Sequence, residues 1–141
     1  MIRVVWITKD GKTNKEQKRV SSILAELYAK LLKEFKIART IPLLLVDEAS
    51  WNYKGGLNMN PKSVAHYNEG IRFKTGSKPQ EAILLREAVL RWDDAQSAIP
   101  KILRHELTHA KLKGKEKGNE HAGIFKKTAG KYGNVAKKGD Y

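Results

Sequence analysis

The stretch RHELTHAKLKG at residues 104–114 carries two histidines four residues apart, His105 and His109, with Glu106 directly after the first. Residues four apart in a helix lie one turn apart on the same face, so both imidazoles can reach one ion. Glu106 is rotated about 100° from His105, so its carboxylate can address a water on that ion. A zinc hydrolase needs these parts: nitrogen ligands, an open coordination position and a carboxylate base. We therefore expect one Zn²⁺ per chain, held by His105 and His109, with Glu106 as the catalytic base.

A zinc site of this type needs a third protein ligand. The chain contains no cysteine, so that ligand must be a histidine, aspartate or glutamate. We expect it to be His121, at the start of a helical segment that Phe125 can anchor. Glu120 is the alternative, because neighbouring residues of a helix point in different directions and only one of the two can bind. The remaining histidine, His66, is expected to be an ordinary strand or surface residue.

The two histidines are expected on a helix over residues 97–112, preceded by the capping residues Asp93 and Asp94. Pro100 would lie in its first turn, where proline is tolerated. Its apolar face would be formed by Ile99, Leu103, Leu107 and Ala110. Its solvent-facing side would be formed by Lys101, Arg104, Thr108 and Lys111. The histidines lie between these two faces, where we expect a cleft.

The elements before this helix predict an α+β domain. Residues 2–8 and 41–46 are apolar runs typical of strands. Between them, a capping box from Thr13 to Glu16 predicts the start of a helix of about five to six turns. The apolar residues of this helix recur at helical spacing: Val20, Ile23, Leu24, Leu27, Leu31 and Phe35.

The remaining elements are less regular in sequence. Residues 65–73 predict a second strand region broken by a turn near residues 68–70, and residues 81–92 fit either a strand or a helix. A last helix is expected to begin at Asn119 and to end at Gly133. Residues 134–141 are expected to form a basic, disordered tail outside the folded domain.

Charge points to a polyanionic partner. The chain has 28 Lys+Arg against 15 Asp+Glu, a formal net charge of +13, which favours DNA or another nucleic acid through phosphate contacts. The candidate contacts are Lys111, Lys113, Lys115, Lys117, Lys126 and Lys127; the alternative is that these lysines are only a solvated surface. Trp51 and Tyr53 are candidates to stack on unpaired bases, although aromatic residues in a loop more often pack onto a core.

The sequence gives no indication of a membrane partner. The N-terminus has no cleavage site typical of a signal peptide, and no apolar stretch approaches the roughly 20 residues of a membrane span. We expect a cytoplasmic or nucleoid-associated protein.

These residues resemble the SprT-like family of zinc metalloproteases, which includes the Spartan proteases that cleave proteins crosslinked to DNA. The shared motifs are HELTHA at residues 105–110 and HAGIF at residues 121–125, and AHYNEGIRF at residues 65–73 is similar to the family's hairpin before the active helix. The resemblance implies a single zincin-like domain over residues 1–133. The zinc ribbon of many relatives is absent, because the chain has no cysteine.

The resemblance also implies the roles of the site residues: His105, His109 and His121 as zinc ligands and Glu106 as the base. The function expected is a zinc-dependent endopeptidase acting on nucleic-acid-associated proteins, with Tyr67 or His66 as a second donor to the oxyanion. The alternative is a non-catalytic nucleic-acid-binding module in which zinc only ties the last helix to the histidine helix. A protease of proteins not bound to DNA is a third possibility.

Overall fold

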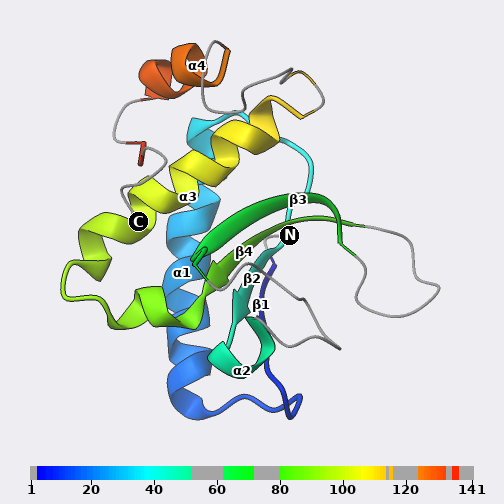
Figure 1. Cartoon of the computed structure of the whole chain (residues 1–141), viewed down its shortest axis with the longest axis vertical. Helices are drawn as coiled ribbons and strands as arrows, with labels where there is room; N and C mark the ends of the chain where they lie inside the picture. The colour runs from blue at the N-terminus through cyan, green and yellow to red at the C-terminus, as the bar shows by residue number, and fades with distance from the viewer. Residues whose placement is uncertain are drawn as a thin grey trace.

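The computed structural model describes residues 3–51, 62–71, 80–113, 115, 124–132 and 135–136. Within these ranges the chain is an α+β structure with a four-stranded mixed sheet, four α-helices and one 3₁₀ helix, which confirms the expected class (Figure 1). None of the described helices combines the length and the apolarity that crossing a membrane requires.

The sheet has the strand order β1-β2-β4-β3. Strands β1 (Val4–Ile7), β2 (Leu43–Val46) and β4 (Gln80–Arg86) run parallel, and β3 (Ala65–Ile71) pairs antiparallel to β4 at the edge. The long helix α1 (Lys15–Glu34) makes the crossover that two adjacent parallel strands need. The sheet therefore ends in one antiparallel edge strand, beside which the histidine helix packs.

Both faces of the central strands are buried. The face toward the helices carries Leu43, Leu45, Ile83 and Leu85, and the opposite face carries Leu44, Val46, Ala82 and Leu84. This two-sided burial explains why these strands read as unbroken apolar runs in the sequence instead of alternating. It also resolves the ambiguity of residues 81–92, which form most of β4 followed by a 3₁₀ helix at Glu87–Arg91.

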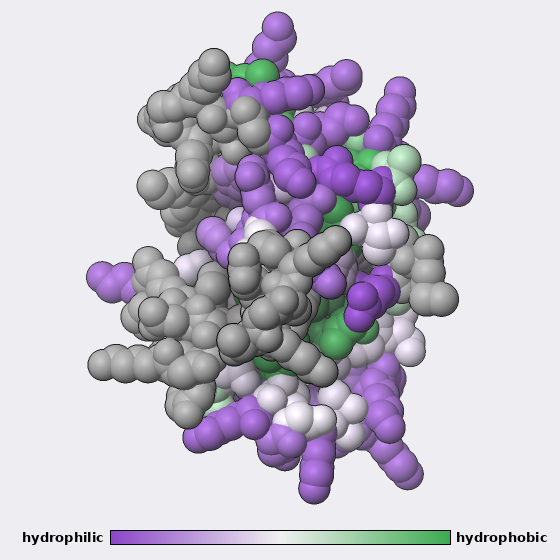
Figure 2. Space-filling view, turned by 90° about the vertical axis from the view of Figure 1, so that its right-hand side faces the viewer, coloured by the Kyte–Doolittle hydropathy of each residue, from purple (hydrophilic) through white to green (hydrophobic). Residues whose placement is uncertain are grey.

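The surface drawn in Figure 2 is mostly hydrophilic among the described atoms, with small hydrophobic areas between charged and polar side chains. Ile23 of α1 is 54% exposed, so its apolar side chain lies on the surface. It was expected on the buried face of that helix. The other apolar positions of α1 are buried or partly buried against the core.

The start of α1 lies one residue later than the capping box expected from Thr13 to Glu16. Asn14 is the N-cap: its side chain accepts from the Gln17 amide over 2.7 Å, and the Gln17 side chain accepts from the Asn14 amide over 2.9 Å. Glu16 instead pairs with Arg19 on the exposed side of the first turn. The same type of cap forms in the next register, because Asn-x-x-Gln satisfies the two orphan amides as well.

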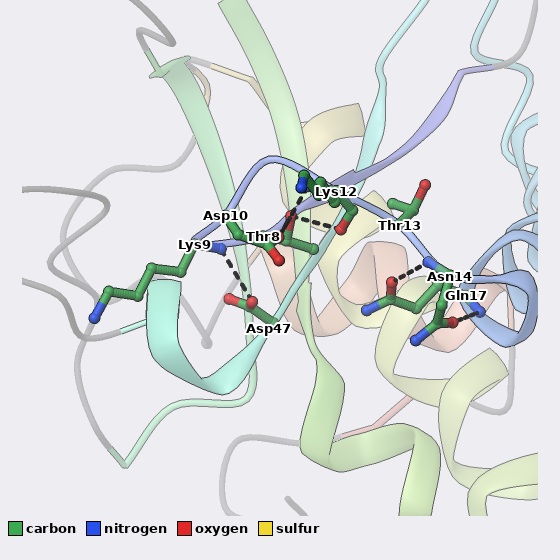
Figure 3. A pocket seen from close by; sticks show the side chains of 8 residues that line it. All are labelled: Thr8, Lys9, Asp10, Lys12, Thr13, Asn14, Gln17 and Asp47. Atoms are coloured by element: carbon green, nitrogen blue, oxygen red, sulfur yellow. Dashed lines mark hydrogen bonds between the residues drawn. The ribbon is translucent and has the colours of Figure 1, made fainter.

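An open hollow of about 650 Å³ adjoins this helix start, at the carboxyl ends of β1 and β2 (Figure 3). It is lined by Thr8, Lys9, Asp10, Lys12, Thr13, Asn14, Gln17 and Asp47. Its polar groups are largely used within the protein: Asp10 accepts from the Lys12 amide over 2.9 Å in a local turn, and Asp47 accepts from the Lys9 amide over 3.1 Å between the two strand ends. None of the residues expected to do chemistry lies in it.

The end of α1 is a Schellman motif. Lys36 adopts a left-handed conformation with φ 53°, the Ile37 amide donates to the Leu32 carbonyl over 3.0 Å, and the Lys36 amide donates to the Lys33 carbonyl over 3.0 Å. Ile37 and Leu32 are both buried, which supplies the apolar contact that accompanies this motif.

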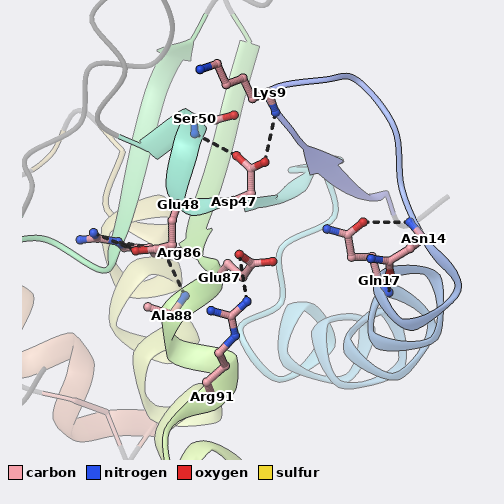
Figure 4. A network of polar contacts seen from close by, with 10 residues as sticks. All are labelled: Lys9, Asn14, Gln17, Asp47, Glu48, Ser50, Arg86, Glu87, Ala88 and Arg91. Carbon is pink, nitrogen blue, oxygen red and sulfur yellow. Dashed lines mark hydrogen bonds and ion pairs between the residues drawn. The ribbon is translucent and has the colours of Figure 1, made fainter.

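A polar network fixes the short helix α2 (Glu48–Trp51) to the end of β4 (Figure 4). Arg86 forms an ion pair with Glu48 at 3.0 Å, and its guanidinium lies 5.7 Å from the centre of the Trp51 ring. Trp51 is fully buried in the core on this side of the sheet. The idea that it stacks on bases is therefore wrong, because its ring is already packed; Tyr53 lies outside the described residues.

The strand β3 and the histidine helix differ from the expected segments in their bounds. The strand region at residues 65–73 is not broken by a turn; β3 continues to Ile71, with a shift of register between Asn68 and Ile71 where the Asn68 side chain accepts from the Gly70 amide. The histidine helix α3 (Ala95–Lys111) begins two residues earlier than expected, so Pro100 lies inside the helix and not in its first turn. The last helix, α4, spans Ile124–Tyr132.

Candidate metal centre

The six residues from His105 to Ala110 are all buried, although they lie on one continuous helix. Leu103 and Leu107 belong to the core between α3, α1 and the sheet. On the other side, α4 packs over α3, so this part of the helix is covered from two directions (Figure 1). A helix in such a place has little solvent-facing side, which is why Thr108, expected to be exposed, is buried and donates to the Arg104 carbonyl over 2.7 Å.

The two histidine rings lie close together, as the sequence predicts. Their centroids are 5.1 Å apart with an edge-on arrangement, and Phe125 of α4 contacts both rings at 5.0 Å and 4.5 Å. The expectation that Phe125 anchors α4 on this face is confirmed. The expected cleft is not: His105, Glu106 and His109 are 2%, 4% and 9% exposed, because Phe125 and its helix cover them.

The ring of His105 is oriented by a backbone carbonyl. Its Nδ1 lies 2.6 Å from the carbonyl oxygen of Ala136, which can only accept a hydrogen bond. In the neutral ring the proton is therefore on Nδ1, and Nε2 keeps its lone pair. Histidines that bind metals have this arrangement, with one ring nitrogen donating to a carbonyl or carboxylate and the other free for the ion. His105 thus fits a metal ligand.

The third ligand was expected at His121 or Glu120. Both candidates, His121 and Glu120, lie outside the described residues. Among the residues that are described, no three histidine, cysteine, aspartate or glutamate side chains come together as a metal site. His66 pairs with Leu84 across β3 and β4, so it lies on the sheet face away from α3, where its side chain is exposed. This matches the surface-strand role expected for it and makes it an unsuitable donor to the oxyanion.

A second polar cluster fixes the end of α3 directly after His109. Arg39, in the connection after α1, donates to both oxygens of Glu81 at 2.6 and 2.9 Å and to the Ala110 carbonyl at 2.7 Å. Tyr67 of β3 donates its hydroxyl proton to the same carboxylate. The cluster joins two strands to the carboxyl end of the histidine helix. It also occupies the Tyr67 hydroxyl, which was a candidate donor to the oxyanion.

The electrostatics of this cluster favour an ionised Glu81. Burial alone would raise the pKa of its carboxyl, but the hydrogen bonds from Arg39 and Tyr67, with the charges of Arg39 and Lys113, outweigh burial and lower it. Burial and the hydrogen bond to Glu81 raise the pKa of Tyr67. The cluster therefore holds a carboxylate, a guanidinium and a neutral phenol at neutral pH.

The lysines expected to meet nucleic acid are divided between two neighbouring places in the fold. Lys113 and Lys115 are exposed after the end of α3, Lys126 and Lys127 are exposed on α4, and Lys111 is partly buried. Lys117 lies outside the described residues. Because α4 packs on α3, the described lysines after α3 and on α4 belong to two elements that lie side by side (Figure 1).

Two partners of the site gave no signal in the sequence. Ala136 is 31 residues from His105, and Arg39 is 71 residues from Ala110, so neither contact is local. An alanine whose carbonyl matters, or one arginine among many basic residues, has no distinguishing pattern. Comparison with protein family models, with curated proteins and with solved structures finds no match.

Proposed function

We propose that this protein is a zinc-dependent endopeptidase of the SprT-like type. One observation carries the proposal: two histidines lie one helical turn apart with their rings 5.1 Å apart, and the Nδ1 of His105 is held by a backbone carbonyl, as in histidines that bind metals through Nε2. Glu106 lies between them in the sequence and is buried beside them. The order of elements, from an N-terminal helix through a small mixed sheet to the histidine helix and α4, supports a zincin-like domain.

His121 is the proposed third ligand. It precedes Phe125 by four residues, and Phe125 contacts both histidine rings. A residue this close in the chain to a side chain on the site is within reach of the same ion. Three neutral imidazoles leave a fourth coordination position open, as a catalytic zinc site requires.

A bound zinc ion would supply Lewis-acid chemistry, polarising the peptide carbonyl and activating a water. Glu106 would take the proton from that water and deliver it to the leaving amine. His105 and His109 orient the site, and the Arg39–Glu81 cluster holds the end of their helix against the sheet. Because Glu106 is buried, a substrate has to displace part of the α4 cover before turnover.

The burial of Glu106 also fits the alternative function, a nucleic-acid-binding module with a structural zinc ion. A zinc ion enclosed between α3 and α4 would suit a structural site in a nucleic-acid-binding module, where Glu106 has no chemical role. The exposed lysines near the end of α3 and on α4 fit nucleic-acid contact in either case. In the proposed enzyme they bring it to proteins bound to DNA.

Zinc content tests the ligand set. Wild type, His121→Ala and His66→Ala are purified side by side and their zinc per chain is measured. We expect about one equivalent in wild type and in His66→Ala, whose side chain lies on the other sheet face, and a clear loss in His121→Ala. Unchanged zinc in His121→Ala would exclude His121, and Glu120→Gln would be examined next. Little zinc in folded wild type would remove the basis of the proposal.

Glu106→Gln separates the enzyme from the structural module. The amide has nearly the same shape but cannot take a proton, so zinc should stay bound while cleavage of an unfolded protein, in the presence of single-stranded DNA, falls by about 10²–10⁴-fold. Cleavage at the wild-type rate would contradict the mechanism. If wild type binds zinc and DNA but cleaves nothing with or without DNA, the structural module is the better account.

A further inference from the structure

Ala136 lies against the middle of α3 and is attached there at two points. The Ala136 amide donates to the Lys101 carbonyl over 3.1 Å, and its carbonyl accepts from His105 Nδ1 over 2.6 Å. Lys101 and His105 are one turn apart on the helix. Ala136 is 5% exposed and belongs to the main core. A segment expected to be a disordered tail is therefore packed on the helix at this residue.

Two-point attachment fixes where the Ala136 carbonyl points. A residue bonded only through its carbonyl could rotate about that bond, whereas the second bond, from its own amide to the Lys101 carbonyl, holds both sides of the Ala136 Cα against one turn of α3. The Lys101 carbonyl can accept this bond in addition to its helical one, because a carbonyl oxygen has two lone pairs. The Ala136 carbonyl is therefore a fixed acceptor for Nδ1 of His105.

We propose that Ala136 is the positioning residue of the metal site. It selects the Nδ1–H form of His105, and the unprotonated Nε2 of that form can coordinate an ion. The inference rests on the proposed function in taking zinc as the ligand. Ala136 touches neither ion nor substrate; it acts through the orientation and tautomer of His105. Outer partners of this kind typically change metal affinity by about 10–100-fold when they are lost.

The tautomer can be measured without any metal. Long-range ¹H–¹⁵N NMR spectra of zinc-free wild type distinguish a protonated from a bare ring nitrogen, and comparison with His105→Gln assigns the signals. We expect protonated Nδ1 and bare Nε2 at a pH where the ring is neutral. A ring protonated on Nε2, or an even mixture of both forms, would overturn the inference whatever the zinc content.

A matched pair of substitutions at Ala136 tests the consequence. Ala136→Pro removes the amide that bonds Lys101 and should displace the carbonyl, whereas Ala136→Gly keeps both backbone contacts. Competition with a zinc chelator should show affinity about 10–100-fold weaker for Ala136→Pro and close to wild type for Ala136→Gly. The proline variant should also lose the single tautomer of His105. Wild-type affinity together with an altered tautomer would show that this positioning does not matter for binding.

The results separate this inference from the proposed function. Weaker zinc binding by Ala136→Pro in a protein that cleaves no substrate supports the positioning role and counts against the peptidase. Wild type with the Nδ1–H tautomer but no affinity for zinc refutes the metal site, and with it the role of Ala136 toward zinc. Circular dichroism of both variants checks that α3 and the sheet are intact, so that a loss of affinity reports on the site.

Discussion

Glu81 shows how a single side chain can join several parts of the fold. Its carboxylate accepts from Arg39 and Tyr67, and Arg39 in turn holds the carbonyl of Ala110, the residue after His109. The side chain of Glu81 is 9% exposed, so these bonds form away from most of the solvent. Charged hydrogen bonds in such surroundings contribute more than surface ion pairs do.

Glu81→Gln should lower the free energy of unfolding by about 1–3 kcal/mol at pH 7, because it removes the charge from a buried hydrogen-bonded carboxylate. The pKa of Glu81 is lowered in the folded state. Its ionised carboxylate therefore stabilises the fold above the ordinary pKa of 4.5, and this stabilisation is lost as pH falls through the pKa of the folded state. In urea unfolding, the difference in the free energy of unfolding between wild type and Glu81→Gln should be larger at pH 7 than at pH 3.

Glu16→Gln is the control for this comparison. Glu16 also pairs with an arginine, but both side chains are exposed, so its loss should have a much smaller effect at either pH. An equal loss of stability at both pH values in Glu81→Gln would show that packing of the side chain, and not its charge, makes the contribution.

The ends of the helices were harder to predict than their middles. The apolar spacing of α1 and the HELTHA segment located two helices correctly, because burial of one face depends on residues close in sequence. The caps differ: Asn14 and Gln17 compete with Thr13 and Glu16 for the same role, and the sequence alone does not decide between adjacent registers. The extent of burial of α3 depends on α4, which is distant in sequence.

Lys36 offers a test at the end of α1. Its left-handed conformation, with φ 53°, is strained for any residue with a side chain and is the position where helices usually carry glycine. Lys36→Gly should raise the free energy of unfolding by roughly 0.5–1 kcal/mol in urea titrations.

The same substitution three residues earlier should have the opposite sign. Lys33 is exposed within the last turn of α1, where glycine loses more chain entropy than lysine, so Lys33→Gly should lower the free energy of unfolding by roughly 0.5–1 kcal/mol. If both variants lose stability equally, the end of the helix is not the Schellman motif described here.

Across the described part of the molecule, exposed lysines lie both near the candidate site and far from it. Lys126 and Lys127 on α4 are at one end of the molecule, and Lys15 and Lys18 at the start of α1 are at the other (Figure 1). Both pairs are exposed, so replacing either changes the net charge equally. The two pairs therefore distinguish a local binding surface from a general effect of charge.

Replacing Lys126 and Lys127 with glutamine should weaken DNA binding and reduce the slope of log affinity against log salt by roughly 1–2, as expected for lost phosphate contacts. Replacing Lys15 and Lys18 should leave that slope nearly unchanged. Fluorescence anisotropy at several salt concentrations gives both slopes. Equal changes in the two variants would mean that DNA is attracted by overall charge and not by the end of the molecule that carries α4.

The sequence was sufficient to place His105, Glu106 and His109 together on one helix, since residues four apart lie one turn apart. It was insufficient for the residues around them. Ala136, Arg39 and Glu81 reach the helix only because the sheet and α4 bring distant segments together. Local periodicity carries no information about such contacts, which is why the expected cleft became a covered site.

The 31 residues between His105 and Ala136 also set an order in time. A ribosome adds about 5–20 residues per second, so the carbonyl that orients His105 is made roughly 2–6 seconds after the histidine itself. Throughout that interval the growing chain already contains the strands and the HELTH turn but not the group that prepares the ring for an ion. In the proposed metal site, a zinc ion would therefore meet a fully oriented His105 only after Ala136 has been added and packed.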